Sequence, residues 1–195
     1  MQVDWGVELG ADDEVLEIPW ATSDAGPRYW DLKRHPDQLP NVEEANRFPE
    51  LAEFLTAVNS SGGMLETAKC DVWSSTDMNP EEEIFGALHK FGSYVDLVFA
   101  DEGSRFSFPE HEQFVKQIAE LLRRVPEIPA SSEFLVRRCY YHVADANEPC
   151  QGFYVTNYLF GYGADERQAR QQWVIGMKLV ENLIRQISAK RQWLT

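Results

Sequence analysis

The sequence contains few cysteines, and their number excludes a disulfide-stapled scaffold. Only three occur in 195 residues, Cys70, Cys139 and Cys150, and no two of them have CxxC spacing. A set that is small and odd in number cannot build a disulfide framework. We therefore expect reduced and mostly buried thiols, as in a cytosolic protein.

Basic residues are also scarce. The chain has 18 Lys and Arg residues against 32 Asp and Glu residues, which gives a formal net charge of −14. This excess disfavours nucleic acid and anionic membranes as partners, because both attract a basic surface. A basic protein or a cationic ligand remains compatible with the charge.

Long hydrophobic runs are missing as well. No segment approaches the roughly 20 apolar residues that a membrane-spanning helix needs. The acidic N-terminal stretch MQVDWGVELGADDE lacks the basic and apolar regions of a secretory signal. We therefore expect a cytoplasmic protein.

The residues that are present favour a globular fold. The chain is 44% hydrophobic and 12% aromatic, which is far from the composition of a disordered segment. A chain of this length buries roughly 70% of the surface that its unfolded form exposes. We expect one domain over residues 1–195.

A short motif occurs twice in the chain. Phe48-Pro49-Glu50 returns as Phe108-Pro109-Glu110, and the upstream tetrapeptide Tyr29-Trp30-Asp31-Leu32 is matched by Tyr94-Val95-Asp96-Leu97. Self-similarity of this kind indicates a repeated structural unit. It predicts an internal duplication of a strand–strand–helix unit, with pseudo-repeats at 1–62, 63–126 and 127–195.

Three segments have the apolar spacing of amphipathic helices. They are Pro49–Asn59, Ser107–Val125 and Asp165–Lys190. Ser107 with Glu110, and Asp165 with Gln168, have the spacing of a capping box at the helix start. The third helix is long and rich in Lys and Arg at its end, which suits a docked C-terminal helix.

Alternation and β-branched or aromatic content predict strands between the helices. The stronger candidates are 65–74, 91–100, 133–143 and 151–162, and the weaker ones are 3–9, 15–20 and 28–32. Residues 145–149 are a predicted hairpin turn. Strands joined by hairpins favour an α+β fold with an antiparallel sheet covered by helices. Residues 21–46 and 78–83 are predicted as long loops that rim any site.

Two aspartates stand out as candidate catalytic residues. Asp31 and Asp96 hold matching places in the repeated tetrapeptide, and Asp is uncommon in strands. Paired carboxylates can bind a divalent metal, or divide into an acid and a base. With His142 or Glu66 they would make a metal-assisted hydrolase. The alternative is that each aspartate faces solvent or bonds to loop backbone.

A second group of candidates lies on the tyrosine-rich strands. Arg137 is predicted to share a face with Tyr141, and Arg138 is predicted to share the other face with His142. An arginine beside tyrosines such as Tyr158 can anchor a phosphate or carboxylate ligand. The alternative is a structural ion pair with Asp96 or Glu66.

The remaining histidine and cysteine patterns are weak. Cys139 and His142 are predicted to lie on opposite faces of a strand, so they cannot chelate one metal ion. His111 is predicted as a neutral surface ring at a helix start.

Since no catalytic motif is assembled, the leading hypothesis is a non-enzymatic, acidic protein that binds a macromolecular partner. The partner would be a basic protein, as for inhibitor or immunity-type proteins. No cofactor or metal is expected in this case. A metal-assisted hydrolase and a small-ligand binding module remain the alternatives.

Overall fold

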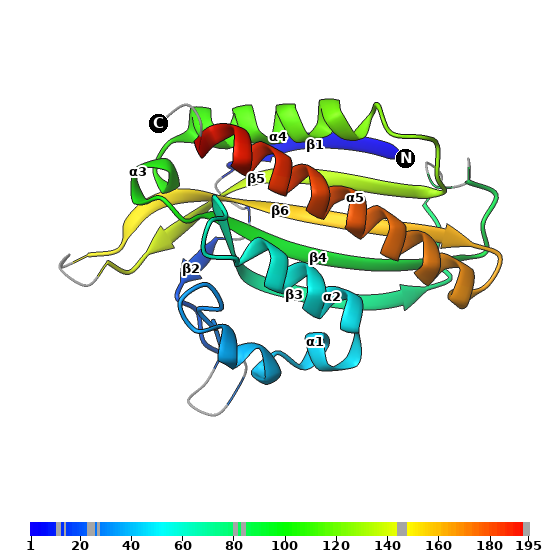
Figure 1. The fold of residues 1–195 in the computed structure, drawn as a ribbon, viewed down its shortest axis with the longest axis horizontal. Helices are drawn as coiled ribbons and strands as arrows, with labels where there is room; N and C mark the ends of the chain where they lie inside the picture. The colour runs from blue at the N-terminus through cyan, green and yellow to red at the C-terminus, as the bar shows by residue number, and fades with distance from the viewer. Residues whose placement is uncertain are drawn as a thin grey trace.

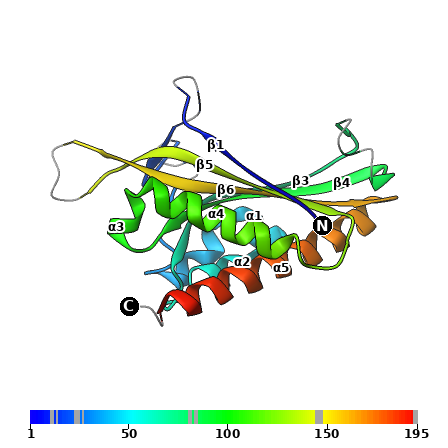
Figure 2. The same ribbon diagram turned by 90° about the horizontal axis from the view of Figure 1, so that it is seen from above.

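The computed structural model describes residues 1–10, 13, 15–22, 26, 28–79, 82, 85–143 and 148–192. They form an α+β fold in which helices cover one face of a six-stranded mixed sheet (Figure 1 and Figure 2). The strands are β1 (Gln2–Glu8), β2 (Leu16–Ile18), β3 (Leu65–Ser75), β4 (His89–Phe99), β5 (Ala130–Tyr141) and β6 (Cys150–Gly163). The helices are η1 (Pro36–Asn41), α1 (Glu43–Arg47), α2 (Pro49–Val58), α3 (Glu102–Arg105), α4 (Phe108–Leu122) and α5 (Glu166–Gln192).

The strand order in the sheet is β1-β5-β6-β4-β3, with β2 also paired to β5 beyond the end of β1. The two hairpins β3–β4 and β5–β6 are antiparallel, and so is the central pair β4–β6. Both β1 and β2 run parallel to β5. The expected antiparallel sheet is therefore wrong at one edge. Hairpin signals are local, whereas the direction of a pairing between the first strand and β5 has no local signal.

The four stronger strand predictions overlap β3 to β6, the prediction 15–20 contains β2, and the prediction 3–9 overlaps β1 but begins one residue late. Residues 28–32 are not a strand, because Arg28 makes only an isolated bridge with Ala21. The predicted loop at 21–46 contains η1 and all but the last residue of α1. Three residues of the predicted turn at 145–149, parts of the loop at 78–83, and 23–25 and 27 lie outside the described residues.

The three predicted helices are confirmed as α2, α4 and α5, and their apolar faces pack on the sheet (Figure 2). In α5 the apolar residues at helical spacing are all buried, namely Ala169, Trp173, Met177, Val180, Ile184 and Ile187. Of the helices in the described part of the chain, none has both the length and the apolar content for crossing a membrane.

Two glycines of β6 let α5 approach the sheet closely. A Cβ atom at Gly161 would lie 2.1 Å from the backbone nitrogen of Trp173, and one at Gly163 would lie 2.5 Å from that of Ala169. Real side chains do not tolerate such distances, so both positions require glycine for packing. Neither residue has a positive φ, so the need for glycine here differs from its usual role in a turn.

The order strand–strand–helix occurs three times, as β1–β2 followed by η1, α1 and α2, as β3–β4 followed by α3 and α4, and as β5–β6 followed by α5. Only the last two strand pairs are hairpins, because β1 and β2 both pair with β5. The second strand of each hairpin lies at the sheet centre, where β4 pairs with β6. The repeated tetrapeptide does not follow this relation, because 29–32 lie outside any strand and 94–97 lie inside β4. The topology thus relates the expected units 63–126 and 127–195, and common ancestry stays a prediction.

The face of the sheet opposite to the helices is covered only at one end in the described structure. There Leu16 and Ile18 of β2 pack with Val98, Cys139 and Tyr141 in a second, smaller core. Trp20 and Tyr29 extend this cover as partly buried neighbours. The rest of this face, over β3, β4, β6 and β5, carries the side chains described next.

Candidate functional site

Four half-buried aromatic side chains form a continuous row on the sheet face opposite to the helices. We call them the aromatic row: Trp73 on β3, Tyr94 on β4, and Tyr158 and Phe160 on β6. The Trp73 ring centroid lies 5.8 Å from that of Phe160 and 6.4 Å from that of Tyr94. The Tyr94 and Tyr158 centroids are 6.0 Å apart. The rings therefore contact one another across three neighbouring strands.

The period of two in a strand explains why these residues share a face. Val95 and Leu159, each next to a member of the row, belong to the core beneath the helices. Gly92 makes room for the row, because a Cβ atom there would lie 2.7 Å from the Phe160 ring and 3.1 Å from Trp73. The glycine thus lets both rings lie close to the sheet.

A cation lies over the aromatic row at each end. The Arg137 guanidinium is 5.6 Å from the Tyr158 ring centroid, and Lys90 Nζ is 5.6 Å from that of Phe160. Each cation is paired with a carboxylate, Arg137 with Glu8 at 2.7 Å and Lys90 with Glu82 at 2.8 Å. Both cations are therefore neutralised, and the row does not form an anion site.

Three of the predicted candidates meet beside the row. Thr156 donates to Asp96 Oδ1 at 2.7 Å and accepts a hydrogen bond from Arg137 at 3.3 Å. Arg137 also donates to the Tyr158 hydroxyl at 3.4 Å. Asp96 is only 5% exposed. The ion pair predicted for Arg137 exists, but its partner is Glu8 of the parallel strand β1, and neither Asp96 nor Glu66.

A cavity of about 460 Å³ lies at the outer edge of β3 and adjoins the row at Tyr94. We call it the edge cavity. Its aromatic lining comes from Trp20, Trp30 and Tyr94, and its lining carboxylates include Glu44 and Asp71. The cavity combines apolar rings with a few charged groups, as ligand pockets commonly do.

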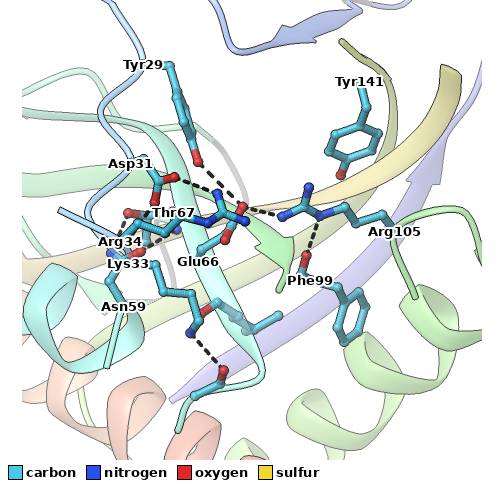
Figure 3. A network of polar contacts seen from close by, with 12 residues as sticks. Tyr29, Asp31, Lys33, Arg34, Asn59, Glu66, Thr67, Phe99, Arg105 and Tyr141 are labelled. Atoms are coloured by element: carbon cyan, nitrogen blue, oxygen red, sulfur yellow. Dashed lines mark hydrogen bonds and ion pairs between the residues drawn. The ribbon is translucent and has the colours of Figure 1, made fainter. Parts of the chain in front are cut away.

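A polar network around Glu66 of β3 holds Tyr29, the neighbour of the lining residue Trp30, against the sheet (Figure 3). The Glu66 carboxylate accepts a hydrogen bond from Arg105 at 2.6 Å and a longer one from the Tyr29 hydroxyl at 3.5 Å. Arg105 also donates to the Phe99 carbonyl at 2.8 Å. Figure 3 shows Glu66 at the centre of this arrangement, with Arg105 reaching it from the side opposite to Tyr29.

Burial raises the pKa of the Glu66 carboxyl above its ordinary value, and the positive charge of Arg105 opposes this rise. Burial together with the neighbouring Glu66 charge also raises the pKa of Tyr29. The Tyr29 hydroxyl therefore stays protonated and can only donate to the carboxylate. The network is a structural ion pair with one phenol attached.

Lys33 and Trp20 make further contacts with β3 and with the turn that precedes it. Lys33 Nζ donates to the carbonyls of Ser60, Gly63 and Leu65 at 2.8–3.0 Å. Trp20 Nε1 donates to the Ala68 carbonyl at 2.8 Å. These side chains satisfy backbone acceptors and place Trp20 and Trp30 over the edge of β3.

The two predicted catalytic aspartates have different surroundings. Asp31 forms an ion pair with Arg34 at 2.6 Å in the loop before η1, and hydrogen bonds from Arg34 lower its pKa although partial burial raises it. Asp96 accepts from Thr156 on the sheet. No group of three His, Cys, Asp or Glu side chains that could hold a metal ion occurs in the ranges that the structure describes.

The other predicted site residues are dispersed. His142 Nε2 lies 3.1 Å from a Glu17 oxygen at the exposed end of β5. Arg138 donates to the Gly10 carbonyl. Tyr141 is buried, donates to the Phe153 carbonyl at 2.8 Å, and lies beneath the Arg105 guanidinium. Tyr141 shares a face with Arg137, as predicted from the period of two. Its ring, however, contacts Arg105, which pairs with Glu66.

The structure corrects the prediction for His111, which is fully buried and not a surface ring. Its Nδ1 lies 2.9 Å from the Ser107 carbonyl and its ring packs edge-on against Phe99 at 4.7 Å. Burial lowers the pKa of His111, so the neutral form expected from the sequence is favoured. Burial raises the pKa of Cys139 to about 12, which keeps this thiol protonated and unreactive.

Sequence reasoning missed several residues of the row and of the cavity. The role of Trp73 and Tyr94 could not be predicted, because single aromatic residues in strands usually pack in cores. Trp20 and Trp30 line the edge cavity, and no local sequence pattern distinguishes this position from the cover of a core edge. Arg105 had no recognisable signal, since its partner Glu66 is 39 residues away.

Comparison with known proteins gives no family for this chain. No protein-family model, no curated protein and no solved structure matches it. The candidate site therefore has to be interpreted from its own chemistry.

Proposed function

We propose that this chain is a non-enzymatic binding protein for a basic protein partner, and that the partner docks on the aromatic row. The single observation that carries the proposal is the row itself. Four half-buried aromatic residues lie in contact on a sheet face that the described helices leave open. Large aromatic side chains are enriched in the energetic centres of protein interfaces.

The charge of the chain supports a basic partner. The net charge is −14, and the cations Arg137 and Lys90 at the row are already paired with carboxylates. The exposed Asp71 and Glu133 lie on the same face of the sheet. A field of this sign attracts a basic protein and speeds its association.

The test begins with capture of proteins by the immobilised chain from a lysate of its source cells at low salt. Each captured protein is then purified, and its affinity is measured for the wild type and for Trp73→Ala. We expect a basic protein whose binding weakens at least about 30-fold in the variant, as for an interface hot spot of about 2 kcal/mol.

The matched control is Ile175→Ala, which removes an exposed apolar side chain from the helix layer instead. This variant should bind like the wild type. A partner that binds Trp73→Ala and the wild type equally, or one that is itself acidic, would contradict the proposal. Retention of no protein at low salt would count against it equally.

We also propose that residues 63–126 and 127–195 are copies of one ancestral unit and that the protein acts in the cytoplasm. The shared strand–strand–helix order and the antiparallel pairing of β4 with β6 support the duplication. The three free cysteines support a reducing compartment.

A further inference from the structure

The edge cavity differs from the aromatic row because it encloses space. Its volume of about 460 Å³ lies within the range of ligand pockets. Its described lining comes mainly from β3, from Tyr94 of β4, from Trp20, Arg28 and Trp30, and from residues 41–44 at the start of α1.

The rings in this cavity already hold cations of the chain itself. Lys69 Nζ lies 5.8 Å from the Trp20 ring centroid, and the Arg28 guanidinium lies 5.2 Å from that of Trp30. Both distances are within the roughly 6 Å at which the ring quadrupole attracts a positive charge. Aromatic walls of this type form the cages that bind ammonium ligands.

The charges that line the cavity are predominantly negative. Among the described lining residues, three carboxylates outnumber the two cations Arg28 and Lys69; they belong to Glu43, Glu44 and Asp71. The Cys70 thiol, also in the wall, has a raised pKa because of burial and because of the charges of Glu44, Asp96 and Asp71. The carboxylates therefore impose a negative potential at the cavity wall, which favours a positive ligand.

We propose that the edge cavity binds an organic cation, an alkylammonium or guanidinium group, between its tryptophan rings and its carboxylates. The aromatic rings would contact the carbon atoms and attract the charge. The carboxylates of Glu44 and Asp71 would compensate the charge. The ligand is either a Lys or Arg side chain of a protein or a free organic cation, since both present the same chemistry. The inference does not depend on the proposed protein partner.

An anionic ligand is the rival interpretation, because Arg28 and Lys69 are also in the wall. The two interpretations predict opposite effects for Arg28→Gln. Removal of this exposed positive charge tightens the binding of a cation and weakens the binding of an anion. Glutamine is shorter than arginine but stays polar, so the variant removes the positive charge without placing an apolar group in the wall.

The experiment is calorimetric titration of the full chain with choline and with its neutral carbon isostere, 3,3-dimethylbutan-1-ol. We expect choline to saturate one site and the alcohol to bind at least about tenfold more weakly. Glu44→Gln and Asp71→Asn should each weaken choline binding about three- to tenfold, and Arg28→Gln should tighten it. Glu120→Gln, on the exposed side of α4, is the matched control and should leave it unchanged.

Trp30→Leu tests the aromatic wall and should also weaken choline binding, while Asp71→Asn keeps the test valid if the tryptophan variant does not fold. Asp71 is exposed, and its asparagine substitute can still accept the hydrogen bond from the Val72 nitrogen. Three results would overturn the proposal: no saturation by choline at about 50 mM, equal binding of the alcohol, or unchanged affinity in both carboxylate variants.

A parallel titration with a capped Gly-Arg-Gly peptide identifies the source of the cation. Tighter binding of the peptide than of choline assigns the cavity to a protein side chain, and the reverse assigns it to a free ligand; both support the site. Failure here is distinguishable from failure of the partner proposal. The partner proposal is judged by Trp73→Ala, which lies outside the cavity lining.

Discussion

At the scale of single residues, the ion pair between Glu66 and Arg105 is the most consequential polar contact. The side chains are 5% and 18% exposed, and the oxygen–nitrogen distance is 2.6 Å. A buried pair contributes little compared with apolar packing, but loss of one partner leaves the other charge uncompensated. The fold therefore requires both residues together, because either one alone would leave a buried charge without a counter-ion.

The first prediction concerns Arg105→Met, which keeps apolar volume but removes the charge. It should lower the free energy of unfolding by about 3–5 kcal/mol at neutral pH, because Glu66 stays buried without its counter-ion. Urea unfolding followed by fluorescence measures this value. Arg124→Met, which removes an exposed arginine near the end of α4, is the control and should change stability by under about 0.5 kcal/mol.

The pH dependence of the same variant gives a second prediction. The folded-state pKa of Glu66 is raised above 4.5, so the folded chain binds more protons than the unfolded chain between the two values. The contribution of Glu66 to stability therefore falls as pH rises through this window. Arg105→Met removes an attraction that lowers the pKa, so its loss of stability should be smaller at about pH 5 than at about pH 7.5. An equal loss at both values would contradict the prediction.

The sequence indicated some of the residues that make polar contacts, but it predicted the wrong partners for them. Asp96 was singled out because aspartate in a strand needs a reason, and its burial with Thr156 supplies one. The match with Asp31 in the repeated tetrapeptide did not help, since the two residues lie in different local structures. Partners such as Glu8 for Arg137 depend on the parallel pairing of β1 with β5, which no local pattern shows.

At the scale of elements, the packing of α5 on β6 depends on the absence of a side chain at Gly161. The nearest atoms to a Cβ there belong to the backbone of α5, at 2.1 Å and 2.3 Å. Backbone atoms of a buried helix cannot move away locally. The helix would have to shift as a whole.

The third prediction follows from this contact. Gly161→Ala should destabilise the chain by about 3 kcal/mol or more, at the upper end of overpacking effects. Gly103→Ala in α3 is the matched control, because its nearest neighbour is the Asp101 carboxylate at 3.3 Å and alanine favours a helix. Thermal unfolding of both variants decides. Similar unfolding midpoints for the two variants would show that the position of α5 does not depend on its close packing at Gly161.

The fourth prediction compares two helix starts with the same sequence spacing. Asp165 Oδ1 accepts from the Gln168 nitrogen at 2.7 Å, whereas Ser107 makes no side-chain cap. Asp165→Ala should therefore cost about 1 kcal/mol, and Ser107→Ala should cost much less. Chemical unfolding of the two variants measures the difference, and equal losses would contradict the observed caps.

The capping-box spacing of Ser107 and Glu110 fails for a reason that the sequence does not contain. The Glu110 carboxylate pairs with Arg191 at the end of α5, which attaches the C-terminal helix to α4. Amphipathic spacing and helix starts were readable from the sequence, and so were the hairpins. The short helices η1 and α1 were missed because they lack a long apolar period.

At the scale of the whole molecule, the net charge of −14 governs both stability and association. Like charges repel in the compact state, and salt screens this repulsion. The fifth prediction is that raising NaCl from about 10 to about 200 mM increases the unfolding midpoint by about 2 °C or more, since about 1 kcal/mol shifts a chain of this size by roughly 2–4 °C. A lower midpoint at high salt would show that ion pairs outweigh the repulsion.

The same charge sets the expected kinetics of partner binding. Electrostatic steering accelerates association at low salt and loses its effect as the ionic strength rises. The dissociation rate depends instead on the contacts of the aromatic row. The salt dependence of the association rate therefore reports the electrostatic contribution, and the dissociation rate reports the contribution of the aromatic row.

Hydroxyl-radical footprinting of the complex with the captured partner shows whether the partner covers the aromatic row. Oxidation of the row residues Trp73, Tyr94, Tyr158 and Phe160 is compared with that of Trp5 and Phe108, which pack on the helix side and are also partly buried. Binding should protect the row and leave the oxidation of Trp5 and Phe108 unchanged. Protection of Trp5 and Phe108 without protection of the row would contradict it.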